Sequence, residues 1–237
     1  MSASVEELLQ RCGTQLWRAR QGEGDAGAST AAGLPTGYAA LDRCLPGGGW
    51  PRQGLIEILS DQRGTGELRL LLPALAALCH EAGATEFPPL RSKDAGCHAG
   101  SAMLPHDRGS RGWIVWVSPP HRPYAPALAA WGIDVARMLV VQAAAATEWA
   151  MNQALRAEAC SAVLGWADPR DSQALRRLQL AAEASCSLAV LYRPLQAGLT
   201  PSPAVLRLAL LGTNGDGLQV RIVKSRGGRP ATVNLGH

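Results

Sequence analysis

The residues with the clearest chemical meaning lie between a short apolar strand and a helix, in the segment from Ser60 to Leu68. Strand, glycine-bearing turn and helix is the order that a phosphate-binding loop requires, because backbone N–H groups at the start of the helix cradle the phosphates. Such a loop reads G-x-x-x-x-G-K-[ST], with the lysine on the β- and γ-phosphates and the hydroxyl on magnesium. The segment here reads SDQRGTGEL, so its glycines resemble that loop and its charged positions do not.

The charge at the lysine position has the wrong sign for a nucleotide. With Gly66 as the second glycine, Glu67 takes the lysine position, Leu68 takes the hydroxyl position, and the loop is longer than the motif. Two unit charges about 4 Å apart interact with about 4 kcal/mol at an effective dielectric constant of about 20, and here attraction becomes repulsion. We therefore predict no cofactor, no metal and no catalytic residue in this degenerate loop. Its residues of interest are Ser60, Gly64, Thr65, Gly66, Glu67 and Leu68.

Apolar periodicity predicts the elements that position this loop. Residues 55–59 form a short apolar run, and from Gly66 leucines recur at helical three- and four-residue steps. Further strands are expected at 113–117, 138–141, 162–165 and 188–192, and helices at 123–131, 147–160 and 171–185. This alternation predicts a mainly parallel sheet with helices on both faces. Two later runs, 205–211 and 218–223, flank the sequence GTNGDG and predict an antiparallel hairpin extension at the edge of the sheet.

Size and composition favour one α/β domain. The chain has 237 residues, 47% of them hydrophobic, which is enough for a full core. We divide it into an N-terminal amphipathic helix and flexible linker at 1–33 and a domain at 34–237, with a long surface loop at 83–112. The six cysteines form no C-x-x-C pair, and no apolar run is long enough to span a membrane. These features predict a cytoplasmic protein without disulfides, and the cysteine and histidine spacings fit no common zinc site.

Three separated motifs carry a resemblance to a known family. They are LPGGGWP at Leu45–Pro51, GELRLLLPAL at Gly66–Leu75 and WVSPPHRPYAPALAAWGID at Trp116–Asp134. Together with the run TGYAALDRCLPGGGWPRQGLIEI from Thr36, they resemble ImuA, a RecA-like family of accessory proteins in bacterial inducible translesion synthesis. The resemblance implies a RecA-like α/β fold.

Three positions that RecA-type ATPases use for catalysis carry other residues here. Glu67 replaces the lysine, Pro120 falls where a glutamate would polarise the attacking water, and Trp166 stands where an aspartate would hold magnesium. His121 follows two prolines and is typical of a turn. Because cation, base and metal anchor are useful only together, we predict that the protein does not hydrolyse ATP.

The resemblance implies a non-catalytic adaptor in SOS-induced mutagenesis. Its implied partners are RecA, ImuB and, indirectly, an error-prone C-family DNA polymerase, while weak DNA binding and homo-oligomerisation stay open. One alternative is a DNA-dependent ATPase with unorthodox ligands such as Arg63, Thr65 and Asp168. The other is a cell-division inhibitor of the SulA kind, which we rank last because SulA-type proteins are shorter and are not expected to carry the motifs at Gly66 and Trp116.

Three surfaces are candidates for contacts with partners or nucleic acid. The apolar face of the N-terminal helix either docks a partner or folds onto its own core; its residues are Leu8, Leu9 and Trp17. A basic cluster near the C-terminus either contacts phosphates or a partner, or is a solvated strand whose charge prevents edge-to-edge association. Its residues are Arg221, Lys224, Arg226 and Arg229. Trp50, between three glycines and a proline, is expected to be an exposed anchor for a partner or a base.

Overall fold

The computed structural model describes residues 32–61, 67–82, 112–157, 159–169, 171–214 and 217–236. The predicted N-terminal helix with Leu8, Leu9 and Trp17 lies outside the described residues, and so does most of the predicted loop at 83–112. Arg63, Gly64, Thr65 and Gly66 of the degenerate loop also lie outside them. The statements made from the sequence about these segments therefore stay predictions.

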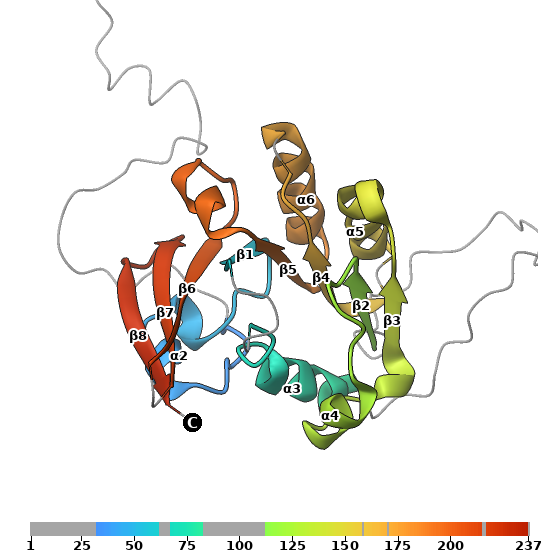
Figure 1. Cartoon of the computed structure of the whole chain (residues 1–237), viewed down its shortest axis with the longest axis horizontal. Coiled ribbons are helices and arrows are strands. Elements are labelled where there is room, and N and C mark those ends of the chain that lie inside the picture. The colour runs from blue at the N-terminus through green and yellow to red at the C-terminus, as the bar shows by residue number, and fades with distance from the viewer. Residues whose placement is uncertain are drawn as a thin grey trace, which may run out of the picture.

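An eight-stranded sheet runs through the domain in the order β3-β2-β4-β5-β1-β6-β7-β8 (Figure 1). The pairs from β3 to β6 are parallel, whereas β6–β7 and β7–β8 are antiparallel. This confirms the prediction of a mainly parallel sheet with an antiparallel C-terminal extension. The strands are β1 Leu55–Leu59, β2 Trp113–Val117, β3 Met138–Val141, β4 Cys160–Trp166, β5 Leu188–Arg193, β6 Leu206–Asn214, β7 Gly217–Ser225 and β8 Ala231–Gly236.

Helices cover both faces of the sheet. In Figure 1, α5 and α6 lie on one face, and α3 and α4 lie on the other. The α-helices are α2 Ala39–Asp42, α3 Leu72–Ala82, α4 Ala125–Ala130, α5 Thr147–Arg156 and α6 Ser172–Ala184. The described residues also contain four short 3-10 helices, which are η1 Pro46–Gly48, η3 Val135–Arg137, η4 Ala144–Ala146 and η5 Leu195–Leu199. No helix of the described residues is long and apolar enough to cross a membrane.

The two faces of the sheet contribute to separate apolar clusters. Ile56 and Ile58 of β1 belong to one cluster together with Leu75 of α3. Leu55 belongs to another, together with Met151 of α5 and Leu178 of α6. Because successive side chains of a strand point to opposite faces, the apolar residues of β1 pack against both layers of helices.

Helix α3 begins later than the leucine periodicity predicted. The sequence placed its start near Gly66, but the helix runs from Leu72 to Ala82, and residues 67–71 form turns. Proline is tolerated in the first turn of a helix and breaks its interior, so Pro73 fits a helix that starts at Leu72. The predicted apolar face is nevertheless buried, since Leu71 and Leu75 are fully covered.

The C-terminal extension contains one strand more than predicted. Strand β8 pairs with β7, so the basic residues of β7 lie on an inner strand and not on the outermost one. The sequence ATVNLG is short and contains both Asn and Gly, which are depleted in strands, and this explains why it was missed. The interpretation of the basic cluster as an edge strand is therefore wrong.

Candidate functional site

A small pocket lies at the carboxyl ends of the parallel strands, where open α/β sheets bind their ligands. Its volume is about 220 Å³, and it is lined by residues that follow β1, β2, β4 and β5. Ser60 and Glu67 of the degenerate loop contribute to it, together with Ser118, Pro120 and the segment after Trp166. The residues singled out by comparison with ATPases are thus brought together at one end of the sheet.

Stacked aromatic rings form one wall of this carboxyl-end pocket. Trp166 lies on Tyr192 with ring centroids 4.8 Å apart and planes 5° apart. On its other side it stacks on Trp116, at 5.5 Å and 26°. The side chain at the position where RecA-type ATPases have a metal-binding aspartate is therefore packed between two other rings.

Glu67 and Tyr192 make the pocket unfavourable for added negative charge. Glu67 is 6% exposed, and its backbone carbonyl accepts a hydrogen bond of 3.3 Å from the Tyr192 hydroxyl. Burial raises the pKa of Tyr192 well above 10, and the negative charge of Glu67 raises it further. The phenol therefore stays neutral at ordinary pH. A triphosphate would be repelled at this position.

Below the pocket, Glu57 forms the centre of a buried charge network. Its side chain is fully buried in the middle of β1. Arg193 donates from Nη1 to Oε1 at 3.2 Å, and Arg207 donates from Nε to Oε2 at 2.7 Å. Ser202 also donates to Oε1, at 2.6 Å. Burial of a carboxylate is costly unless it is paired and hydrogen-bonded, and here both oxygens are satisfied.

Arg193 connects this network to Asp168 at the pocket. It donates to Oδ1 of Asp168 from Nη2 at 2.8 Å and from Nε at 3.3 Å, and to the carbonyl of Pro169 at 3.1 Å. Asp168 was the acidic ligand of the ATPase alternative, and one of its oxygens is held by this guanidinium. The network was missed in the sequence, although a glutamate inside the apolar run LIEIL indicates a buried charge that needs a partner.

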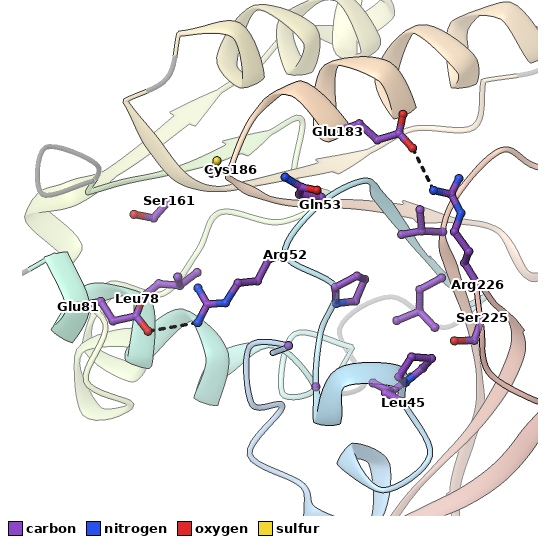
Figure 2. A pocket seen from close by; sticks show the side chains of 16 residues that line it. Leu45, Arg52, Gln53, Leu78, Glu81, Ser161, Glu183, Cys186, Ser225 and Arg226 are labelled. Atoms are coloured by element: carbon purple, nitrogen blue, oxygen red, sulfur yellow. Dashed lines mark hydrogen bonds and ion pairs between the residues drawn. The ribbon is translucent and has the colours of Figure 1, made fainter. Parts of the chain in front are cut away.

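A larger cavity opens at the opposite, amino end of the parallel strands (Figure 2). Its volume is about 660 Å³, and two ion pairs lie on its wall. Arg52 lies 3.7 Å from Glu81, and Arg226 lies 3.2 Å from Glu183. Because each of these charges already faces an opposite one and the cavity lies away from the carboxyl ends, we assign no chemistry to it.

Exposed apolar side chains gather near β3, at one edge of the sheet. Leu139 and Val140 of this strand are 48% and 42% exposed. Beside the strand, a hollow of about 470 Å³ is lined by side chains from β3, η3 and α4. We call this region the β3-edge surface; its residues are Leu128, Val135, Met138, Leu139 and Val140. Such a surface suits contact with another protein better than any reaction.

Two further residues discussed from the sequence, Trp50 and His121, differ in their exposure. The prediction that Trp50 is an exposed anchor is wrong, because Trp50 is fully buried in the main apolar cluster. Its backbone forms an antiparallel bridge with Leu34, which turns the indole into the core. His121 is exposed in the turn before α4, as its sequence context predicted.

The basic cluster is exposed but partly engaged with the protein itself. Lys224 donates to the carbonyl of Ser202 at 2.7 Å, and Arg226 pairs with Glu183. Burial lowers the pKa of Lys224, and the positive charges of Arg207 and Arg226 lower it further. Arg221 and Arg229 are also exposed. Contact of this cluster with phosphates or a partner stays a prediction.

Comparison with known proteins shows a local similarity to a cell-division inhibitor. Over 84 residues the chain is 37% identical to "Cell division inhibitor SulA" of Edwardsiella piscicida, a match that covers 35% of this chain and 50% of that protein. A crystal structure of SulA from Pseudomonas aeruginosa matches with 21% identity and a TM-score of 0.37, covering 59% of this chain and 97% of that one. No family model matches the chain.

These comparisons overturn the main functional prediction from the sequence. The match to SulA supports the alternative that was ranked last, and nothing found supports the translesion-synthesis adaptor. The adaptor prediction is therefore wrong. Its physical basis was three short motifs, and similarity of loops and helix faces does not by itself specify a function.

Proposed function

We propose that the protein inhibits cell division in the manner of SulA, as part of a bacterial response to DNA damage. The observation that carries this proposal is the 37% identity to the SulA of Edwardsiella piscicida over 84 residues. Because the chain spans half the length of that relative, the activity and the target are both part of the proposal. The target is a protein of the division machinery, the tubulin-like division protein.

The inhibitor acts by binding and not by catalysis. The chemistry of the carboxyl-end pocket supports this part of the proposal, because Glu67 stands where a nucleotide needs a cation and Trp166 stands where it needs a magnesium ligand. The acidic group nearest to them, Asp168, is held by Arg193 at 2.8 Å. Among the described residues, no group of three or more His, Cys, Asp or Glu side chains is placed to hold a metal ion.

A RecA-type core is part of the same proposal. It is supported by the position of β1 inside a mainly parallel sheet and by Ser60, Asp61 and Glu67, which line the pocket at the carboxyl edge of that sheet. On this view the scaffold is retained for the shape of its surface, while aromatic rings form a wall at the end of the sheet that would bind a nucleotide.

Capture by the purified, tagged chain tests the proposal. Purified tubulin-like division protein, RecA and ImuB are offered separately, each with and without ATP and magnesium. We expect capture of the division protein, unchanged by nucleotide. Failure to capture it, or capture of RecA or ImuB in its place, would overturn the proposal. The matched negative control is Ile58→Asp, which puts a charge into the fully buried centre of β1 and removes the fold.

A further inference from the structure

The cavity at the amino end of the parallel strands has room for several apolar side chains. Its volume is about 660 Å³. Removal of one buried leucine side chain from a protein core leaves a cavity of about 150 Å³, so this one holds several side chains of that size. Beyond the two ion pairs on its wall, the surface that it offers is largely apolar. We call it the amino-end cavity; its apolar lining residues are Leu45, Pro46, Pro51, Leu78, Val205 and Leu206.

The chain enters the described domain at the wall of this cavity. Gly33 is one of the lining residues, and its backbone N–H donates to the carbonyl of Gly47 at 2.8 Å. A Cβ atom on Gly33 would lie 2.9 Å from backbone atoms of Gly49, so any side chain here would force the backbone to shift. This close approach fixes the point at which residues 1–31 join the domain, and that point belongs to the cavity wall.

The segment that precedes this point carries an apolar stripe in its sequence. Residues 4–20 are predicted to form an amphipathic helix, and five of their side chains follow the i, i+3, i+4, i+7 and i+11 spacing of one helix face. They are Val5, Leu8, Leu9, Cys12 and Leu16. Because an isolated helix of this length is only marginally stable in water, such a face needs apolar surface to pack against.

The connecting residues are long enough to bring this stripe to the cavity. Residues 21–32 are rich in Gly, Ala and Ser, and a chain of that length and composition has an r.m.s. end-to-end distance of about 20 Å. Such a tether gives the two ends an effective concentration in the millimolar range. The chain's own N-terminal segment therefore has an advantage over any partner that is free in solution at a lower concentration.

We propose that residues 4–20 dock their apolar stripe into the amino-end cavity of the same chain. This is the binding mode of an amphipathic helix in an apolar groove, and it removes apolar surface of both helix and cavity from water. Of the two roles that the sequence leaves open for Leu8 and Leu9, the proposal selects folding onto the chain's own domain. It does not rest on the proposed division target.

Two cysteines provide a direct test of this docking. Cys12 belongs to the stripe, and Cys186 is exposed and lines the cavity (Figure 2). A short bis-maleimide is added to the full chain with its thiols reduced, and the linked peptides are identified by mass spectrometry. We expect a link between Cys12 and Cys186 at a yield that does not depend on protein concentration. Cys186→Ser should abolish it.

Two neighbouring substitutions show whether the apolar stripe is responsible. Leu9→Asp should lower the yield of the link at least about tenfold, because a carboxylate would then have to be buried among apolar side chains. Gln10→Asp is the matched control, since it adds the same charge one position away and outside the stripe. It should leave the yield unchanged, and circular dichroism should show the same folded domain for both variants.

An equimolar mixture of unlabelled and isotopically labelled chains identifies the occupant of the cavity. Links within one copy are the expected result. Links between a labelled and an unlabelled copy would show that a second chain is the occupant and would overturn the proposal. It would also be overturned by the absence of a link between Cys12 and Cys186, by a link from Cys186 to Cys97 in its place, or by equal yields for Leu9→Asp and Gln10→Asp.

Discussion

Trp166 lies flat on Tyr192, with the ring planes 5° apart, at the carboxyl end of the parallel strands. The hydroxyl of Tyr192 in turn donates to the backbone of Glu67. An aromatic stack thus links β4 and β5 to the segment that enters α3. This relationship fixes the backbone at Glu67 against the carboxyl ends of two neighbouring strands.

Removal of the indole tests the structural role of this stack. Trp166→Ala should lower the free energy of unfolding by about 3 kcal/mol, because the half-buried ring loses contact with two aromatic neighbours. The measurement is urea denaturation followed by circular dichroism. Trp149→Ala is the matched control, since Trp149 is 66% exposed, and its cost should stay within about 0.5 kcal/mol. Equal costs for the two variants would contradict the role of the stack.

The same variant tests whether nucleotide binding is prevented by the bulk of the indole or by the charge of Glu67. Trp166→Ala enlarges the pocket, but Glu67 remains, so neither the variant nor the unchanged chain should bind labelled ATP and magnesium. Micromolar binding with DNA-stimulated turnover by the unchanged chain would instead support the ATPase alternative. Fluorescence titration and a phosphate-release assay provide the two measurements.

Alkaline pH should destabilise the protein through Tyr192. The pKa of this residue is raised well above 10 in the folded state by burial and by Glu67. As pH rises past 10, the unfolded chain loses the phenol proton while the folded chain keeps it, so the free energy of unfolding decreases. Tyr192→Phe has no such proton, and we expect its stability to fall less than that of the unchanged chain between pH 9 and 11. Parallel losses for both proteins would contradict this explanation.

The buried carboxylate of Glu57 should be essential to the fold. Glu57→Gln leaves the guanidinium groups of Arg193 and Arg207 facing a neutral amide, and removing one partner of a buried ion pair costs about 3–5 kcal/mol. Glu81→Gln is the control, because its pair with Arg52 is exposed and should contribute less than about 1 kcal/mol. Urea denaturation of both variants provides the comparison. A change of less than about 1 kcal/mol for Glu57→Gln would show that the network is not needed.

The central part of the fold was predictable because its strands are short apolar runs between helical patterns. Strand β1 at 55–59 and strand β2 at 113–117 were placed correctly on that basis. The start of α3 was placed too early because leucine spacing was weighed without Pro73. Trp50 was misplaced because its burial depends on a backbone bridge to Leu34, which no local pattern indicates.

The candidate site was predictable only in part. The unusual residues Glu67, Pro120 and Trp166 could be identified from the motif, and the structure places all three around one pocket. The partners of Glu57 could not be identified from the sequence. Arg193 and Arg207 are distant from it in sequence and contact it because β5 and β6 lie on either side of β1. The motifs also could not decide between a translesion-synthesis adaptor and a cell-division inhibitor. The similarity to SulA favours the inhibitor.

Cell length after controlled expression in a rod-shaped bacterium tests the central claim most directly. If the protein inhibits division, cells that express it should grow into long filaments while their DNA continues to replicate and segregate, and cells that express Ile58→Asp should not. Cells of normal length, at an expression level that immunoblotting confirms, would contradict the claim.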